Sequence, residues 1–224
     1  MPANTAVVQL EGISKLYGDF AALRKVTAQF SSGQCYVILG ENGAGKSTLL
    51  RVIAGLLHPS FGSLRLFGSD TVQNTRQRVG YLSHASMLYD EMTALENLRY
   101  FSALYACVDK LSPQEALKLV GLDPSLKRPI GQYSQGMRQR AALARVLLAQ
   151  PELLLLDEPF SNIDAASAEQ MLRVLAEMRK QHRTILLTTH QPELTRSLAD
   201  TFCHMRQGEI VAWNAGAPRA GGAA

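Results

Sequence analysis

Residues 40–48 read Gly-Glu-Asn-Gly-Ala-Gly-Lys-Ser-Thr and directly follow the apolar run Cys35–Leu39. Three glycines at this spacing let the backbone curl so that successive N–H groups point inward, and the helix expected next presents its positive end. Such a loop cradles phosphate. Lys46 would reach the β- and γ-phosphates and act in catalysis, and the Ser47 hydroxyl would ligate Mg²⁺. The predicted nucleotide contacts of the loop are Gly40, Asn42, Gly43, Ala44, Gly45, Lys46, Ser47 and Thr48.

Two acidic residues follow a second apolar run. Residues 153–156 are all leucine, and Asp157, Glu158 and the strand-ending Pro159 come next. A strand would hold Asp157 near Mg²⁺ and place Glu158 where a carboxylate can orient and polarise an attacking water. A solvated acidic pair is the alternative, but the phosphate-binding loop favours the catalytic interpretation.

Two more places could contact the terminal phosphate. His190 follows the apolar run Thr184–Thr188, and at the carboxyl end of a parallel strand it would lie on the ligand side of the sheet. Ser134 is a good N-cap and Gly136 permits close backbone approach, so the helix that begins there is a second anion site. One nucleotide could use both helix starts only across an interface with another subunit. A plain capped helix is the alternative.

The pattern of elements that must position these residues predicts an α/β fold. Strands are expected at residues 7–11, 26–30, 63–67, 78–82, 152–156 and 184–188. Capping boxes at Thr93 and Ser112, followed by the N-cap at Ser134, begin three helices. Uniformly apolar strands that alternate with helices are typical of a parallel sheet covered on both faces.

The length of 224 residues favours one domain with one nucleotide site. We expect an α/β core at residues 1–84 and 151–213, a helical insertion at 85–150, and a flexible Gly/Ala-rich tail at 214–224.

Composition narrows the class of protein. The net charge is +4, but no block of Lys and Arg stands out, so no nucleic acid partner is expected. No apolar stretch approaches the ~20 residues of a membrane span, and residues 1–10 lack the pattern of a secretory signal. Cys35, Cys107 and Cys203 lie in apolar surroundings, as expected for reduced thiols of a cytosolic protein.

Taken in order, these motifs resemble the ATP-binding subunits of ABC transporters over residues of about 5–212. The Walker A loop matches residues 40–48, the Walker B strand 153–158, the signature 133–137, the D-loop 161–164 and the switch histidine His190. The resemblance implies a P-loop NTPase (RecA-like) core with a parallel sheet, an N-terminal antiparallel β subdomain and an inserted α-helical subdomain. It also implies ATP and Mg²⁺ as ligands, ATP hydrolysis coupled to transport, and a homodimer or paired ATPase subunit. The partner would be a polytopic membrane subunit, with this chain on the cytoplasmic, inner face of the cell membrane.

The resemblance assigns two further residues and shows two departures. Tyr17 falls where the family stacks an aromatic ring on adenine, although a Tyr packed on the sheet is the alternative. His84 stands where the family usually has the Q-loop glutamine, and its imidazole could accept from water or weakly ligate Mg²⁺. In the signature, Gln135 and Met137 replace a glycine and a glutamine. Since the matching Ser134 and Gly136 carry most of the phosphate contact in the family, function is expected to survive.

The cargo is not fixed by these motifs. Residues 80–84 and 92–98 resemble the ATP-binding subunit of the haem exporter of cytochrome c biogenesis, and lipid, drug or polysaccharide exporters are the alternatives. The short chain favours export over import. A soluble mechanical ATPase and a non-hydrolysing binding module are the competing classes. Glu158 and His190 argue against the binding module, and the lack of a coiled-coil or zinc insertion argues against the mechanical ATPase.

Overall fold

Two β-sheets form the body of the chain in the computed structural model, which describes residues 5–70, 72–105 and 111–216. The larger sheet has the strand order β5-β6-β7-β3-β8-β9, and the smaller one has the order β2-β1-β4. The large sheet contains β3 (Cys35–Leu39), β5 (Val79–Leu82), β6 (Leu153–Asp157), β7 (Thr184–Thr188), β8 (Thr201–Arg206) and β9 (Glu209–Ala215). The small sheet contains β1 (Ala6–Tyr17), β2 (Phe20–Ser31) and β4 (Phe61–Leu66). The helices are α1 (Lys46–Ile53), α2 (Ala94–Leu104), α3 (Pro113–Leu119), α4 (Gln135–Leu147), α5 (Ala165–Lys180) and α6 (Pro192–Thr195), with 3₁₀ segments η1 (Val72–Arg78) and η2 (Ile130–Gln132).

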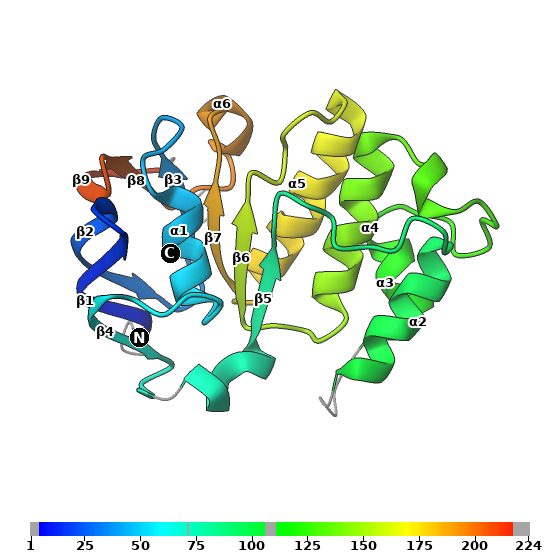
Figure 1. Cartoon of the computed structure of the whole chain (residues 1–224). Helices are drawn as coiled ribbons and strands as arrows, with labels where there is room; N and C mark the ends of the chain where they lie inside the picture. Colours follow the sequence, from blue (N-terminus) through cyan, green and yellow to red (C-terminus); the bar gives the residue numbers. More distant parts are fainter. Residues whose placement is uncertain (1–4, 71, 106–110, 217–224) are drawn as a thin grey trace, which may run out of the picture.

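The large sheet is parallel from β5 to β8 and is covered on both faces, as predicted. Alternate residues of β6 explain the coverage. Leu154 and Leu156 pack into a core with α4 and α5, whereas Leu153 and Leu155 pack into a core with α1 and the small sheet. Because side chains alternate along a strand, a strand buried on both faces reads as an unbroken apolar run. Figure 1 shows α1 on one side of these strands and α4 and α5 on the other.

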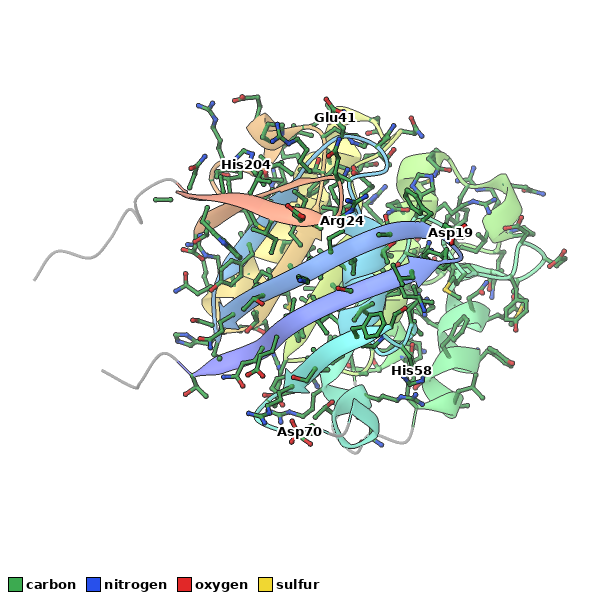
Figure 2. All side chains as sticks on the ribbon, turned by 60° about the vertical axis from the view of Figure 1, so that its left-hand side comes forward. Asp19, Arg24, Glu41, His58, Asp70 and His204 are labelled. Atoms are coloured by element: carbon green, nitrogen blue, oxygen red, sulfur yellow. The ribbon has the colours of Figure 1, made fainter. Side chains whose placement is uncertain are left out.

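Strands β1 and β2 of the small antiparallel sheet are longer than the apolar pattern of the sequence predicts. We expected strands at 7–11 and 26–30, but β1 and β2 pair from Ala6 with Ser31 to Tyr17 with Phe20. The prediction was too short because register shifts interrupt the alternation on which it depended. The turn between the strands carries Gly18 in the left-handed region, at φ 57°. Figure 2 shows this sheet as an outer layer, with Asp19 at the tip of the β1–β2 hairpin.

The helical insertion begins as its capping residues predict. In both α2 and α3 the N-cap hydroxyl, from Thr93 or Ser112, accepts the N–H of a glutamate, whose side chain bonds back. In α4 the Ser134 side chain accepts the N–H of Met137 at 3.2 Å. Buried Asn97 donates to the Tyr89 carbonyl and accepts from the Tyr89 N–H, which fastens the preceding segment to α2. In the described ranges, no helix combines the length and apolar character needed to cross a bilayer.

The structure tests part of two expectations, namely that a flexible tail begins at residue 214 and that the three cysteines are reduced thiols. The flexible tail was placed at 214–224, but β9 runs through Ala215 and the Gly216 N–H donates to the Asp200 carbonyl. The start of the tail was therefore wrong, and residues 217–224 lie outside the described residues. Cys35 and Cys203 are buried free thiols, as expected, and burial raises the pKa of Cys203 to about 12. Cys107 lies outside the described residues.

Candidate functional site

The phosphate-binding loop joins β3 to α1, as predicted, and its glycines are needed for close packing. A Cβ added to Gly45 would lie 2.6 Å from the Ala22 carbonyl oxygen, and one added to Gly40 would clash with the Met205 carbonyl. Gly45 also has φ 99°, a conformation that favours glycine, and it is the N-cap of α1. Neighbouring backbone therefore holds the loop in its curled form.

Lys46 begins α1 and is 6% exposed. Its Nζ donates to the carbonyl oxygens of Gly40 at 2.7 Å and Glu41 at 3.1 Å, and it lies 3.9 Å from Glu158 Oε1. The ammonium group is thus turned back over its own loop. Carbonyl partners of this kind can be exchanged for phosphate oxygens without a change of fold.

Asp157 ends β6 with its carboxylate held by three side chains. The hydroxyls of Ser47 and Thr188 donate to Oδ1 at 2.8 Å and 2.9 Å, and the Tyr81 hydroxyl lies 3.5 Å from Oδ2. Thr188 also accepts the N–H of Glu158 at 2.9 Å. Sequence reasoning missed Thr188, although its strand was predicted and the parallel register places it directly beside Asp157.

Glu158 is a largely buried carboxylate, with its side chain 13% exposed. Its backbone has φ 52°, a left-handed conformation that is uncommon outside glycine and recurs at functional sites. Oε2 lies 3.2 Å from His190 Nε2, while the buried Oε1 has no hydrogen-bond partner in the described structure. Burial raises the pKa of Glu158 above its ordinary value, and the nearby His190 and Lys46 oppose that rise.

A single cavity of about 540 Å³ collects most of the predicted site. Its walls are Tyr17, Phe20, Ala22, Asn42, Gly43, Ala44, Gly45, Lys46, Ser47, Thr48, His84, Asp157, Glu158, Ser161 and His190. Gly40 lies in the adjoining hollow instead, together with Asn42 and His190.

The ring of Tyr17 is about half exposed, and Lys15 Nζ lies 5.4 Å from its centroid. Its place in the cavity wall favours the base-stacking interpretation over packing on the sheet. Phe20 was missed, although it pairs with Tyr17 across the hairpin and is more exposed. An exposed aromatic at a hairpin turn was the available signal.

Ser134 and Gly136 are not among the residues that line this cavity. Ser134 caps α4, and Gly136 packs against the start of α5, where an added Cβ would lie 2.5 Å from Asp164 Oδ2. Asp164 itself caps α5 by accepting the Ser167 N–H. Gly136 thus has a packing role within this chain, and one chain does not bring the two helix starts to one cavity.

The residues predicted to hold Mg²⁺ fit that ion in part. Mg²⁺ is usually held by one or two carboxylates and by substrate phosphates, with water completing its octahedron. The hydrogen-bonded Ser47 hydroxyl and Asp157 carboxylate provide oxygen ligands, and Glu158 lines the same cavity, although its Oε1 atom is buried. His84 lines the cavity as well and is exposed, with no described contact to Asp157.

A parallel sheet with a phosphate-binding loop, an acidic strand end and a helical insertion defines the class of P-loop nucleotide hydrolases. Comparison with known proteins gives the family. The model of the family described as "ABC transporter" matches residues 23–161. The ABC transporter ATP-binding protein NatA of Bacillus subtilis (strain 168) is 38% identical over 197 residues, which cover 85% of this chain and 80% of NatA. The chain therefore belongs to the ABC transporter family, as an ATP-binding, ATP-hydrolysing subunit.

Other relatives and one solved structure agree. The Nod factor export ATP-binding protein I of Burkholderia orbicola (strain AU 1054) is 34% identical, over 97% of this chain and 73% of that protein. The bacitracin transport ATP-binding protein BcrA of Enterococcus faecalis is 31% identical, over 92% and 68%. The dimeric post-hydrolysis state of the ATP-binding cassette MJ0796, bound to ADP and Pi, superposes with a TM-score of 0.84 at 25% identity, covering 93% of this chain and 98% of that one. These matches confirm the predicted fold: a P-loop core, an antiparallel β subdomain and a helical insertion.

Proposed function

We propose that this chain is the ATPase subunit of an ABC exporter, acting as a pair of ATPase subunits beneath a separate polytopic membrane subunit. It would lie on the cytoplasmic, inner face of the cell membrane, without a nucleic acid partner. The observation that carries the proposal is the single cavity that gathers Lys46, Asp157, Glu158 and His190 beside the phosphate-binding loop.

In the proposed reaction, loop N–H groups and Lys46 bind the β- and γ-phosphates, and Tyr17 stacks on the adenine ring. Ser47 and Asp157 would hold Mg²⁺, which supplies charge neutralisation on the phosphates when bound. Glu158 orients the attacking water and accepts its proton, for which a carboxylate with a raised pKa is suited. His190 donates to the γ-phosphate and stabilises the transferred charge.

The pairing of subunits is proposed from the position of the second helix start. Ser134 and Gly136 lie apart from the cavity of their own chain, so we assign them to the γ-phosphate of the opposing subunit. Closure of the pair over ATP would be the working step, and hydrolysis would release it. The dimeric state named for MJ0796 supports this arrangement by analogy.

The pairing is tested with Glu158→Gln, which should bind ATP, hydrolyse it slowly and elute as a dimer only when ATP is present. Size-exclusion chromatography with light scattering makes the measurement, and a chain that binds ATP but stays monomeric would refute the shared site.

The membrane partner and the cargo are proposed separately. Residues 84–105, which include the exposed Tyr89 and Tyr100, would contact the membrane subunit. The relatives' names do not agree on direction, because the Nod factor protein carries export in its name and a phosphonates import ATP-binding protein PhnC of Halobacterium salinarum is 36% identical. A transport assay on the assembled transporter therefore tests export.

Haem is the first cargo to test, on the resemblance of residues 80–84 and 92–98 alone, since the compounds that appear in the relatives' names are bacitracin, Nod factor and phosphonates. Affinity purification of the tagged chain from membranes should yield one polytopic membrane protein. A gene for that protein beside genes of cytochrome c assembly would support haem, and any other neighbourhood would point to lipid, drug or polysaccharide export. Phosphate release measured on the purified chain tests hydrolysis itself.

A further inference from the structure

Helix α1 carries two polar side chains that are four residues apart, Ser47 and Arg51. Residues at this spacing lie one turn apart on the same side of a helix. The Ser47 hydroxyl donates to Asp157 Oδ1 at 2.8 Å. The Arg51 side chain hydrogen-bonds the hydroxyl of Tyr81. The first turn of α1 therefore reaches the end of β6, and its last turn reaches β5.

Tyr81 links these two contacts. It pairs with Leu155 in the parallel register of β5 and β6, which lie side by side in the sheet (Figure 1). Asp157 lies two positions farther along β6, so its side chain is on the same face of the sheet. The Tyr81 hydroxyl there lies 3.5 Å from Asp157 Oδ2. Each oxygen of this carboxylate thus has a contact, since Ser47 and Thr188 donate to Oδ1.

Tyr81 also lines a second cavity, of about 350 Å³, which none of the residues assigned to the nucleotide lines. This cavity is bounded by η1 and β5 and by the ends of α2 and α4, where Arg145 lies, 8% exposed. A ring that borders a cavity is not held by close packing on that side. The hydrogen bonds of its hydroxyl therefore help to fix the position of Tyr81.

The hydrogen bonds run in one direction, from Arg51 to Tyr81 to Asp157. A guanidinium can only donate, so the Tyr81 oxygen accepts from Arg51 and its own proton is left for the carboxylate. The hydrogen bond to Tyr81 raises the pKa of Arg51, and the charge of Asp157 adds to that rise, so the cation lies within electrostatic reach of the carboxylate. A cation at the start of such a chain polarises the hydroxyl and strengthens its hydrogen bond.

We propose that Tyr81 and Arg51 are positioning residues for Asp157 and that they set the affinity of the nucleotide site for Mg²⁺. The inference rests on the proposed function, in which Ser47 and Asp157 hold that ion. Tyr81 holds Oδ2 and leaves Oδ1 beside the Ser47 hydroxyl. Loss of a hydrogen-bond partner behind a metal-binding carboxylate costs ~10- to 100-fold in metal affinity.

The first test is Tyr81→Phe, which removes only the hydroxyl. The measured quantity is the Mg²⁺ concentration that gives half-maximal binding of a non-hydrolysable ATP analogue. We expect it to rise about tenfold or more, while the affinity for the analogue in EDTA stays within about twofold of wild type. A role in packing alone would instead weaken binding with and without Mg²⁺ alike.

Tyr36→Phe is the matched control. The Tyr36 hydroxyl accepts the Ser31 N–H at 2.9 Å, and Tyr36 does not line the nucleotide cavity. This variant also loses one hydrogen bond of a strand tyrosine and should melt at a lower temperature than wild type. Its Mg²⁺ requirement should stay at the wild-type value.

Arg51 is tested by whether it acts through Tyr81. Arg51→Met removes the donor and the charge and keeps an unbranched stem. It should raise the Mg²⁺ requirement about threefold, as expected for the loss of one weak hydrogen bond. The double variant Arg51→Met/Tyr81→Phe should match Tyr81→Phe alone, because an effect carried by the hydroxyl is lost with it.

Three results would overturn the inference. One is a Mg²⁺ requirement of Tyr81→Phe equal to that of Tyr36→Phe. Another is an equal loss of affinity by Tyr81→Phe in EDTA and in Mg²⁺, which would make Tyr81 a packing residue. The third is an effect of Arg51→Met that is unchanged in the Tyr81→Phe background, which would make Arg51 act by its charge alone. If the wild type itself binds the analogue equally in EDTA and in Mg²⁺, the metal site of the proposed function fails, and no variant is needed to see it.

Discussion

The nucleotide cavity and the second cavity each contain a largely buried ionisable side chain, Glu158 in the first and Arg145 in the second. They differ in the partners that the described residues provide for that side chain. In the nucleotide cavity Glu158 has Lys46 at 3.9 Å and His190 at 3.2 Å. In the second cavity the contact described for the Arg145 guanidinium is the Phe101 ring, and residues 106–110, which follow the cavity's Tyr105, lie outside the described residues. Glu158 thus has partners from its own chain, whereas the described residues provide no ion-pair partner for Arg145. The predictions below test whether this difference is functional.

The largest effect is expected at Glu158. Glu158→Gln keeps the size of the side chain and removes its ability to accept a proton, so ATP turnover should fall by ~10²- to 10⁴-fold. Phosphate release under saturating ATP makes the measurement, with binding of a fluorescent ATP analogue as the check that the site is intact. Turnover within about threefold of wild type would mean that Glu158 is not the base.

Thr188 offers the next largest effect, since it supports both acids. Thr188→Val leaves Asp157 Oδ1 with one partner fewer and the buried Glu158 N–H without one. We expect a loss of ~1–3 kcal/mol in the free energy of unfolding, measured by urea denaturation, and a rise in the Mg²⁺ concentration needed for half-maximal nucleotide binding. Thr188→Ser retains the hydroxyl and should stay within ~1 kcal/mol of wild type. Equal behaviour of the two variants would remove Thr188 from the site.

The sequence predicted more of the nucleotide cavity than of the second one for a physical reason. The phosphate-binding loop and the acidic strand end are each formed by residues that are adjacent in sequence, so residue type and spacing are enough to predict their chemistry. Strand pairing places Thr188 and Phe20 at the nucleotide cavity, and Arg145 lies in the wall of the second cavity, where α4 meets α2 and β5. Neither the pairing nor the burial is visible in the residue order. The same limit explains why β1 and β2 were predicted too short, because register shifts hide a continuous ladder.

Stacking at Tyr17 should give a smaller effect, since half of the ring is exposed. Tyr17→Ala should weaken ATP binding by about 1 kcal/mol, or roughly fivefold, while Tyr17→Phe keeps the ring and should bind as wild type. Isothermal titration of the nucleotide measures both. If Tyr17→Ala binds normally, Phe20→Ala becomes the variant to compare, because Phe20 lines the same wall.

The smallest effect concerns the stability of the nucleotide-free chain against pH. Because burial raises the pKa of Glu158, the folded chain binds this proton more tightly than the unfolded chain, and the free energy of unfolding falls as pH rises through the interval between the two pKa values. Glutamine does not titrate. Glu158→Gln should therefore have the higher melting temperature at pH 8, and the difference should shrink as pH falls toward the ordinary pKa of a glutamate. A difference that grows on acidification would show that Lys46 and His190 outweigh burial, so that Glu158 behaves as a member of an ion pair rather than as a buried lone charge.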